Sequence, residues 1–252
     1  MKLRMAIASL LLSGMIDSAH AQDSGWHYLI EPYVMFPNMK GETAIGNVPP
    51  VGVDEDPQDI FENLQIGAML YFEAHNDQWA FSSDVLYMDL EADIDTSNIV
   101  SGGKAGVSQL GWELAAMRRV APWFEVGVSA VYNKIDADVR IDFNSVGPIT
   151  PPSLRGSLSE DWIDPTIVAR ATLPINDKWS FQVRANLGGF GIGSDLMWEL
   201  QANVGYRPSE KWQLSFGYRV IDIDYDKHEG DPDHFRYDIQ TFGPVLRLGY
   251  RF

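Results

Sequence analysis

The sequence predicts an all-β protein: a transmembrane antiparallel up-and-down β-barrel of about ten strands, with short turns at one end and longer loops at the other. Three observations carry this prediction. Apolar and polar residues alternate along nearly the whole chain, which is the period of a strand with one apolar face. Four short polar turns are each followed by a tryptophan, and short connections alternate with longer ones. An indole ring has an apolar face and a wet N–H, so tryptophans at one level of successive strands suit a membrane–water interface.

The N-terminus is predicted to be a cleaved signal peptide over residues 1–21. Lys2 and Arg4 precede a short apolar stretch, and Ala19-His20-Ala21 has the small residues of a cleavage site. The apolar stretch is too short for a transmembrane helix, and no longer one follows. Cleavage after Ala21 then leaves residues 22–252 as a single barrel domain.

Composition limits the function classes. The chain has no cysteine, so disulfides, a lipid-anchored cysteine and thiolate chemistry are excluded. After cleavage, 17 of the 19 basic and 34 of the 35 acidic residues remain, a net charge of −17. Such a chain should repel nucleic acid, and it suits divalent cations or basic partners. No cofactor motif occurs, so no cofactor is expected.

Ten alternating segments are the predicted strands, in a range of eight to twelve. They are residues 26–36, 60–73, 79–87, 109–116, 124–133, 163–173, 179–187, 196–206, 212–219 and 242–252. An even number keeps both termini on one side of the membrane. The five outer loops are predicted at residues 37–57, 91–104, 136–159, 191–194 and 226–234. Short turns in the periplasm and longer loops outside are typical of outer-membrane barrels.

The aromatic girdle predicted at the membrane interface is Trp79, Trp123, Trp179, Trp212, Tyr250 and Phe252. A soluble barrel would also alternate, but it would bury its apolar face. Here the polar face carries whole charges at mid-strand, such as Glu113 and Arg184, and the opposite face is continuously apolar. This arrangement favours lipid outside and a polar interior.

Three short pieces resemble the small OmpA/OmpW-like barrels of the Gram-negative outer membrane. They are Leu248-Gly249-Tyr250-Arg251-Phe252, Gly217-Tyr218-Arg219 and Ile221-Asp222-Ile223-Asp224-Tyr225. The resemblance implies a place in the cell outer membrane, contact with its lipid and lipopolysaccharide, and recognition of the C-terminal strand by the barrel assembly machinery. Arg247 stands where such assembly signals carry a small residue, and typical small members have eight strands. No single member's function transfers.

The inward polar face defines the predicted lumen. Its residues are Glu31, Asp84, Glu113, Glu125, Arg170, Arg184, Glu199, Arg219, Arg247 and Arg251, with Glu73 beside them. Side chains fill barrels of about eight strands, and wide channels need about 16–18. Ten strands therefore predict a narrow, ion-paired polar lumen. Two functions fit it: a small-solute pore, or a structural or surface-interaction barrel whose charges only satisfy one another.

The outer loops are acidic. Asp222, Asp224, Asp226, Asp231 and Asp233 gather in the last one. Carboxylates suit Ca²⁺ or Mg²⁺, which would bridge the loop to lipopolysaccharide phosphates, although the spacing does not match the twelve-residue calcium loop. The simpler interpretation is a solvated loop.

The alternative function is an outer-membrane enzyme with an acidic/His site at the extracellular rim. In that hypothesis Asp224 or Asp226, with His228, opposes Asp89 or Asp93 and orients a water. No known motif stands at these positions, so we expect no enzyme.

Overall fold

The computed structural model describes residues 25–252 except 46–49, 95, 98–99, 145–152 and 228–233. The predicted signal peptide therefore lies outside the described residues. The elements are β1 (His27–Met35), β2 (Asn38–Ile45), β3 (Val51–Glu55), α1 (Pro57–Asn63), β4 (Leu64–His75), β5 (Trp79–Asp93), β6 (Val100–Ala121), β7 (Phe124–Phe143), β8 (Leu154–Pro174), β9 (Trp179–Gly189), β10 (Leu196–Tyr206), β11 (Trp212–Lys227) and β12 (Phe235–Arg251). Among the described residues, no helix is long and apolar enough to cross a membrane.

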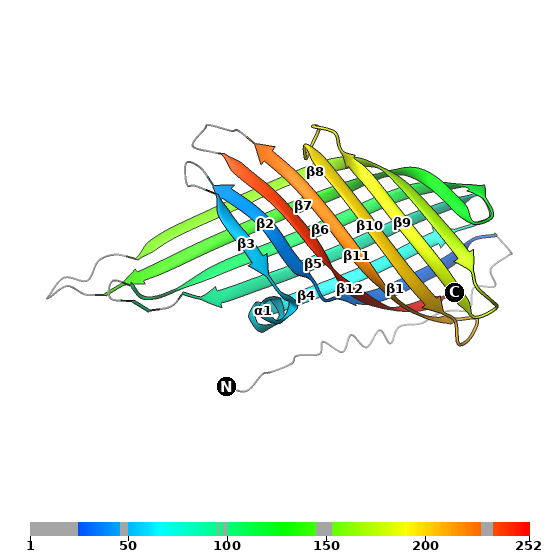
Figure 1. Ribbon diagram of the computed structural model, residues 1–252, viewed down its shortest axis with the longest axis horizontal. Helices are drawn as coiled ribbons and strands as arrows, with labels where there is room; N and C mark the ends of the chain where they lie inside the picture. The colour runs from blue at the N-terminus through cyan, green and yellow to red at the C-terminus, as the bar shows by residue number, and fades with distance from the viewer. Residues whose placement is uncertain (1–24, 46–49, 95, 98–99, 145–152, 228–233) are drawn as a thin grey trace, which may run out of the picture.

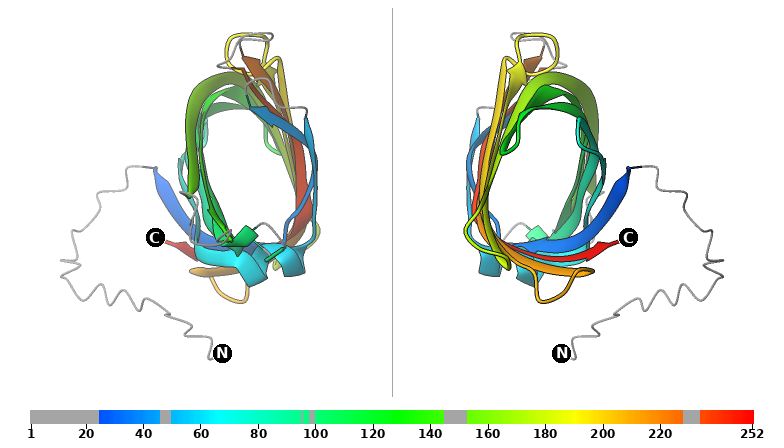
Figure 2. Two further views of the ribbon diagram at one scale, coloured as in Figure 1. Left: turned by 90° about the vertical axis from the view of Figure 1, so that its left-hand side faces the viewer. Right: turned by 90° about the vertical axis from the view of Figure 1, so that its right-hand side faces the viewer.

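Ten of these strands close into an antiparallel up-and-down barrel, which confirms the predicted fold class (Figure 1). The order around the ring is β1, then β4 to β12 in sequence, and β1 pairs with β12 to close it. Figure 2 shows this ring end-on. Each predicted strand corresponds to one strand of the ring. The strand count and the up-and-down topology predicted from the sequence are therefore both confirmed.

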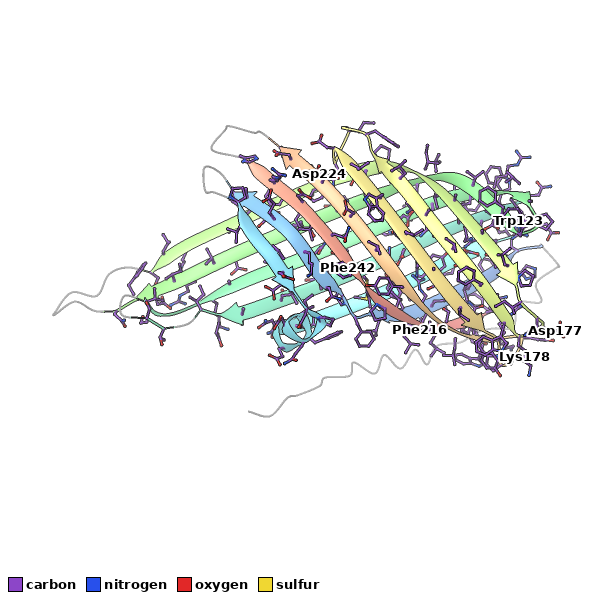
Figure 3. The ribbon with its side chains drawn as sticks, viewed as in Figure 1. Trp123, Asp177, Lys178, Phe216, Asp224 and Phe242 are labelled. Atoms are coloured by element: carbon purple, nitrogen blue, oxygen red, sulfur yellow. The ribbon has the colours of Figure 1, made fainter. Side chains whose placement is uncertain are left out.

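The four short turns lie at one end of the barrel, and side-chain caps shape three of them. The Asn76 side-chain oxygen accepts hydrogen bonds from the backbone N–H groups of Gln78 and Trp79, both at 2.8 Å. Asn176 repeats this arrangement with Lys178 and Trp179, and the Ser209 hydroxyl accepts one such bond, from the N–H of Trp212 at 3.2 Å. Such turns fix where each following strand begins, because the first strand residue donates to the cap. Trp123 and the Asp177-Lys178 turn mark this end, and Asp224 lies toward the other (Figure 3).

The predicted outer loops at 91–104 and 136–159 are largely strand, so both boundaries were wrong. β5 runs to Asp93 and β6 begins at Val100, while β7 runs to Phe143 and β8 begins at Leu154. The β6 extension is rich in glycine and small residues, so its alternation is weak, whereas the β7 extension from Lys134 to Phe143 still alternates but with its apolar residues on the inward face. The backbone ladder nevertheless continues through them.

The predicted loop at 37–57 is a β-hairpin, and the predicted strand at 60–73 was wrong over residues 60–63, which belong to a helix. β2 continues β1 past Phe36 and Pro37 and pairs with the outer half of β12. β3 folds back on β2. The side chain of Asp56 caps α1, with Pro57 in its first turn and Asp59 completing a capping box. Asp, Pro and Asp at this spacing are the local helix signal that the strand prediction overlooked.

The exterior of the barrel carries an apolar band. On β11 the outward residues from Trp212 to Val220 are apolar or aromatic, and the next one is Asp222. On β12 the band runs from Tyr250 to Phe242 and ends before Gln240. Bands of this length match the 9–11 residues with which a tilted strand crosses a bilayer. Phe216, 62% exposed at the middle of the band, faces lipid (Figure 3).

Placing a charge on this band should destabilise the folded barrel. We expect Phe216→Lys to lower the free energy of unfolding by about 2–4 kcal/mol, because a lysine at the bilayer midplane lacks water. Urea unfolding in lipid vesicles measures it. Asp224→Lys, beyond the band on the same strand face, is the control and should cost nothing. Equal effects of the two changes would contradict the placement of the band.

Candidate functional site: the ion-paired lumen

The interior of the barrel has two layers. Toward the short turns, charged and amide side chains dominate the inward face, beside two small apolar clusters that include Leu29 with Tyr71 and Met117 with Val168. Each buried charge there is at most 6% exposed: Glu31, Glu73, Asp84, Glu113, Glu125, Arg170, Arg184, Glu199, Arg219 and Arg247. Nine of the ten residues predicted for the lumen are in this set, and the tenth, Arg251, is half-buried at the short-turn end, where it donates to Gln213.

Arg170 ties opposite walls of the barrel together. It lies on β8 and bonds to Glu125 of the neighbouring β7, with Nε 2.6 Å from Oε2. It also forms an ion pair with Glu73 of β4, on the other side of the lumen. Its Nη1 donates to the hydroxyl of Tyr71 at 3.2 Å. One guanidinium thus compensates two buried carboxylates, which is a geometry that its fork of donors permits.

Arg219 forms a second cross-lumen tie. It lies on β11, and its Nη2 is 2.9 Å from Glu199 Oε2 on β10. Its Nη1 is 3.1 Å from Asp84 Oδ2 on β5, across the barrel. Tyr33 donates its hydroxyl to the other oxygen of Asp84 at 2.7 Å. The layer is therefore held from four strands at once.

Two further arginines complete the network. Arg184 bonds to Glu113 Oε1 at 2.8 Å, an oxygen that also accepts from Asn186. Arg247 lies 3.7 Å from Glu31 and stacks over the ring of Tyr33, 4.5 Å from its centroid. Four arginines thus face a larger number of buried carboxylates.

Sequence reasoning missed Asp164, although its strand parity places it inward. It is fully buried and has no cationic partner among the described residues. Instead it accepts hydrogen bonds from Trp162 Nε1 at 2.9 Å, from Asn133 Nδ2 at 3.0 Å and from both the N–H and the hydroxyl of Ser194. Ser194 belongs to the outer turn between β9 and β10, so Asp164 holds this turn against the barrel.

The outer layer of the interior is apolar, which corrects the prediction of a polar lumen along the whole barrel. Its residues form one cluster that includes Met39, Met88, Val131, Met197, Ile223, Tyr237 and Ile239. The rings of Trp162 and Tyr225 stack 4.1 Å apart within it, joining β8 to β11. On β11 the change comes after Arg219: Ile221, Ile223 and Tyr225 point inward where Gln213 and Ser215 did before.

The predicted girdle residues lie at the short-turn end. Trp79, Trp179 and Trp212 are 38–46% exposed. Trp179 packs on Tyr206 and Trp212 on Tyr250, at 4.7 and 5.0 Å between ring centroids, and Tyr250 stacks on Phe252. Trp123 differs: it lies in a turn and lines the cavity of the lumen at the short-turn end, and Phe124 begins the strand in its place.

The described residues of the predicted acidic rim site do not come together. Asp222, Asp224 and Asp226 lie on the outer face of β11, since Ile223 and Tyr225 point inward. Asp89 and Asp93 lie on the outer face of β5, across the ring, so the two halves of the predicted site face away from each other. Asp226 pairs instead with His234, at 2.9 Å.

A metal site is not formed by the rim residues that the structure describes. Within that part of the chain, no group of three His, Asp or Glu side chains is placed to hold a metal ion. His228, Asp231 and Asp233 lie outside the described residues. Partial burial raises the pKa of Asp224, and the neighbouring Asp238 and Asp195 add to the effect.

The likeness of this chain to known proteins is distant. No family model matches the chain, and no curated protein matches it. The outer-membrane protease OmpT of Escherichia coli is 8% identical, with a TM-score of 0.49 over 90% of this chain and 96% of that one. Ail of Yersinia pestis is 9% identical, with a TM-score of 0.37 over 90% and 99%. The translocator domain of NalP from Neisseria meningitidis is 11% identical, with a TM-score of 0.32 over 92% and 90%.

Likeness this low says nothing of activity. The class of this protein follows instead from its own closed barrel, the apolar band around it and the aromatic residues at one edge of the band. These features have the pattern of an outer-membrane β-barrel.

Removing one arginine of the network should be costly. We expect Arg219→Gln to lower the free energy of unfolding by about 3–5 kcal/mol, because Glu199 and Asp84 would remain buried without their main compensating charge. Urea unfolding in vesicles measures the loss. The matched control is Arg140→Gln, whose exposed pair with Asp142 should contribute less than about 1 kcal/mol. A loss at Arg219 as small as that at Arg140 would refute a compensating network.

The raised pKa of Asp224 predicts a stabilising change. In the folded protein this carboxyl loses its proton less readily than in the unfolded chain, so its ionisation opposes folding at neutral pH. Asp224→Asn should therefore stabilise the barrel near pH 7. The advantage should vanish as the pH falls below the ordinary carboxyl range, where the proton is bound in both states. Denaturant unfolding of both proteins near pH 7 and below the carboxyl range measures the difference in the free energy of unfolding. An equal difference at the two pH values would contradict the prediction.

Proposed function

We propose that the protein is an outer-membrane barrel whose lumen is closed to ions, with a structural or surface-interaction role rather than that of an open small-solute pore. The observation that carries the proposal is the separation of its internal cavities. A cavity of about 320 Å³ lies toward the periplasm and one of about 60 Å³ lies toward the outside, and they have no lining residue in common. The layer formed by Arg184, Glu113, Arg219 and Asp84 stands between them.

The location is part of the same proposal. The apolar band suits the outer membrane, and the short turns would then face the periplasm. Phe252, 62% exposed at the end of β12, is available to the barrel assembly machinery. Lipid and lipopolysaccharide are the proposed surroundings of the barrel. The prediction that the acidic rim binds divalent cations involves Asp231 and Asp233, which lie outside the described part of the chain.

Planar-bilayer recording tests the closed lumen. The refolded wild-type barrel should give no discrete conductance steps. Folding is verified by its faster migration on an unheated detergent gel. Reproducible steps from the wild type would favour the pore instead, and neutralising Arg184 or Glu199 should then change its conductance.

A double variant sharpens this test. Arg184→Ala with Glu113→Ala removes both members of one ion pair. Neither residue is then left charged without the other, and the shorter side chains widen the layer. We expect it to conduct. Arg140→Ala with Asp142→Ala removes an exposed pair outside the lumen and should stay silent. Silence of the lumen variant in a folded barrel would show that other side chains close the path.

A further inference from the structure

The outer cavity combines apolar walls with an acidic floor. Its walls include Met88, Met197, Ile223 and Ile239 from four different strands. Its floor is the top of the ionic layer, where Asp84, Glu113, Glu199 and Arg219 line the same space. A concave apolar site with a few convergent charges is the usual form of a small-molecule site.

Two floor carboxylates each keep one oxygen without a partner. Glu113 uses Oε1 for Arg184, and Glu199 uses Oε2 for Arg219. Among the residues that the structure describes, nothing donates a hydrogen bond to Glu113 Oε2 or to Glu199 Oε1. Both side chains are nearly fully buried, at 4% and 2% exposure. Both free oxygens are covered by neighbouring side chains. A buried carboxylate oxygen without a donor is costly, so an ammonium that enters the cavity and reaches these oxygens by a small shift of the floor would be bound favourably.

The barrel wall beside this cavity is interrupted. The pairing of β1 with β4 ends at Pro32 and Leu70, and Pro32 has no N–H to donate. Farther out, the N–H of Met35 donates to the thioether of Met69 at 3.3 Å instead of to a strand. Side chains rather than a backbone ladder therefore form the wall here.

A second apolar pocket fills this interruption. It has a volume of about 120 Å³ and is bounded on the outside by Ile60 and Phe61 of α1 and by Leu64. Four residues, Met35, Pro37, Met69 and Met88, line both this wall pocket and the outer cavity. Methionine side chains are flexible and repack readily, so they form a soft partition between the two spaces.

We propose that the outer cavity and the wall pocket together bind a small organic cation, a protonated amine with a short hydrocarbon tail. Its ammonium group donates to the free oxygens of Glu113 and Glu199. Its tail passes the methionines into the wall pocket and reaches the lipid side between β1 and β4. A carboxylate or phosphate would be repelled by this floor, and the apolar walls disfavour a hydrated metal ion. The site goes beyond a closed barrel, since it needs no path through the ionic layer.

Binding to the wild-type protein tests the proposal without any mutation. Calorimetry is performed on the full barrel in nanodiscs of phosphatidylcholine, a lipid without a primary amine, with empty discs as the blank. The probes are n-butylamine, 1-butanol and butyrate, which share one tail length. We expect n-butylamine to bind at least tenfold more tightly than the other two. Equal affinity for butanol, or no heat beyond that of empty discs, would overturn the proposal.

Charge variants locate the ammonium. Glu113→Gln and Glu199→Gln keep the side-chain shape and should each weaken n-butylamine binding about tenfold or more. Glu125→Gln is the matched control, because Glu125 is also buried and paired with arginine but lines only the periplasmic cavity. An equal loss in all three folded variants would assign the effect to the ionic network as a whole and would overturn the site.

A wall variant locates the tail. Gly67 lines the wall pocket, and the nearest atoms to a Cβ added there belong to the flexible end of Leu64, at 3.3 Å or more. Gly67→Val should weaken the binding of n-butylamine and leave that of methylamine unchanged, since methylamine has no tail to place there. A loss for both amines, or for neither, would contradict the assignment of the tail to the wall pocket.

Discussion

The change of solvent along the outside of the barrel, from lipid to water, is the constraint on which the rest of the structure depends. A strand has only two faces, so the environment of one face decides what the other can carry. Within the band, the apolar residues of β11 from Trp212 to Val220 face lipid, and Gln213, Ser215 and Arg219 point into the interior. Beyond the band, Asp222, Asp224 and Asp226 face water, and Ile221, Ile223 and Tyr225 point into the interior.

Both internal layers follow from this inversion. Charges that face inward at membrane depth have neither lipid nor bulk water, so they pair across the lumen, and arginines whose forks reach two carboxylates tie opposite walls together. Where the outside is water, the interior packs as an apolar core and the Trp162–Tyr225 stack joins distant strands. The boundary between the layers lies where apolar walls meet unpaired carboxylate oxygens. The proposed amine site therefore lies at the level at which the solvent outside changes.

Much of this could be predicted from the sequence. Alternation gave ten strands and placed residues such as Glu113 and Arg184 on the inward face, because a period of two is local and needs no tertiary contact. The inversion at Asp222 was not recognised, because the same alternation continues with its chemical meaning reversed. Helix α1 was missed because its capping signal is shorter than the strand pattern that surrounds it. The hydrogen bonds to Asp164 and the end of the pairing between β1 and β4 depend on residues far apart in the chain, which no local pattern records.

The inversion is tested most directly by the accessibility of nitroxide labels placed one at a time along β11, from position 214 to position 226, in lipid vesicles. Oxygen concentrates in lipid, and a charged nickel chelate stays in water. The account predicts that labels at even positions up to 220 meet oxygen and not the chelate, that labels at 222, 224 and 226 meet the chelate, and that the odd positions on both sides are shielded from both reagents. Even positions that keep lipid-like accessibility beyond 220, or odd positions from 221 onward that meet the chelate, would contradict it.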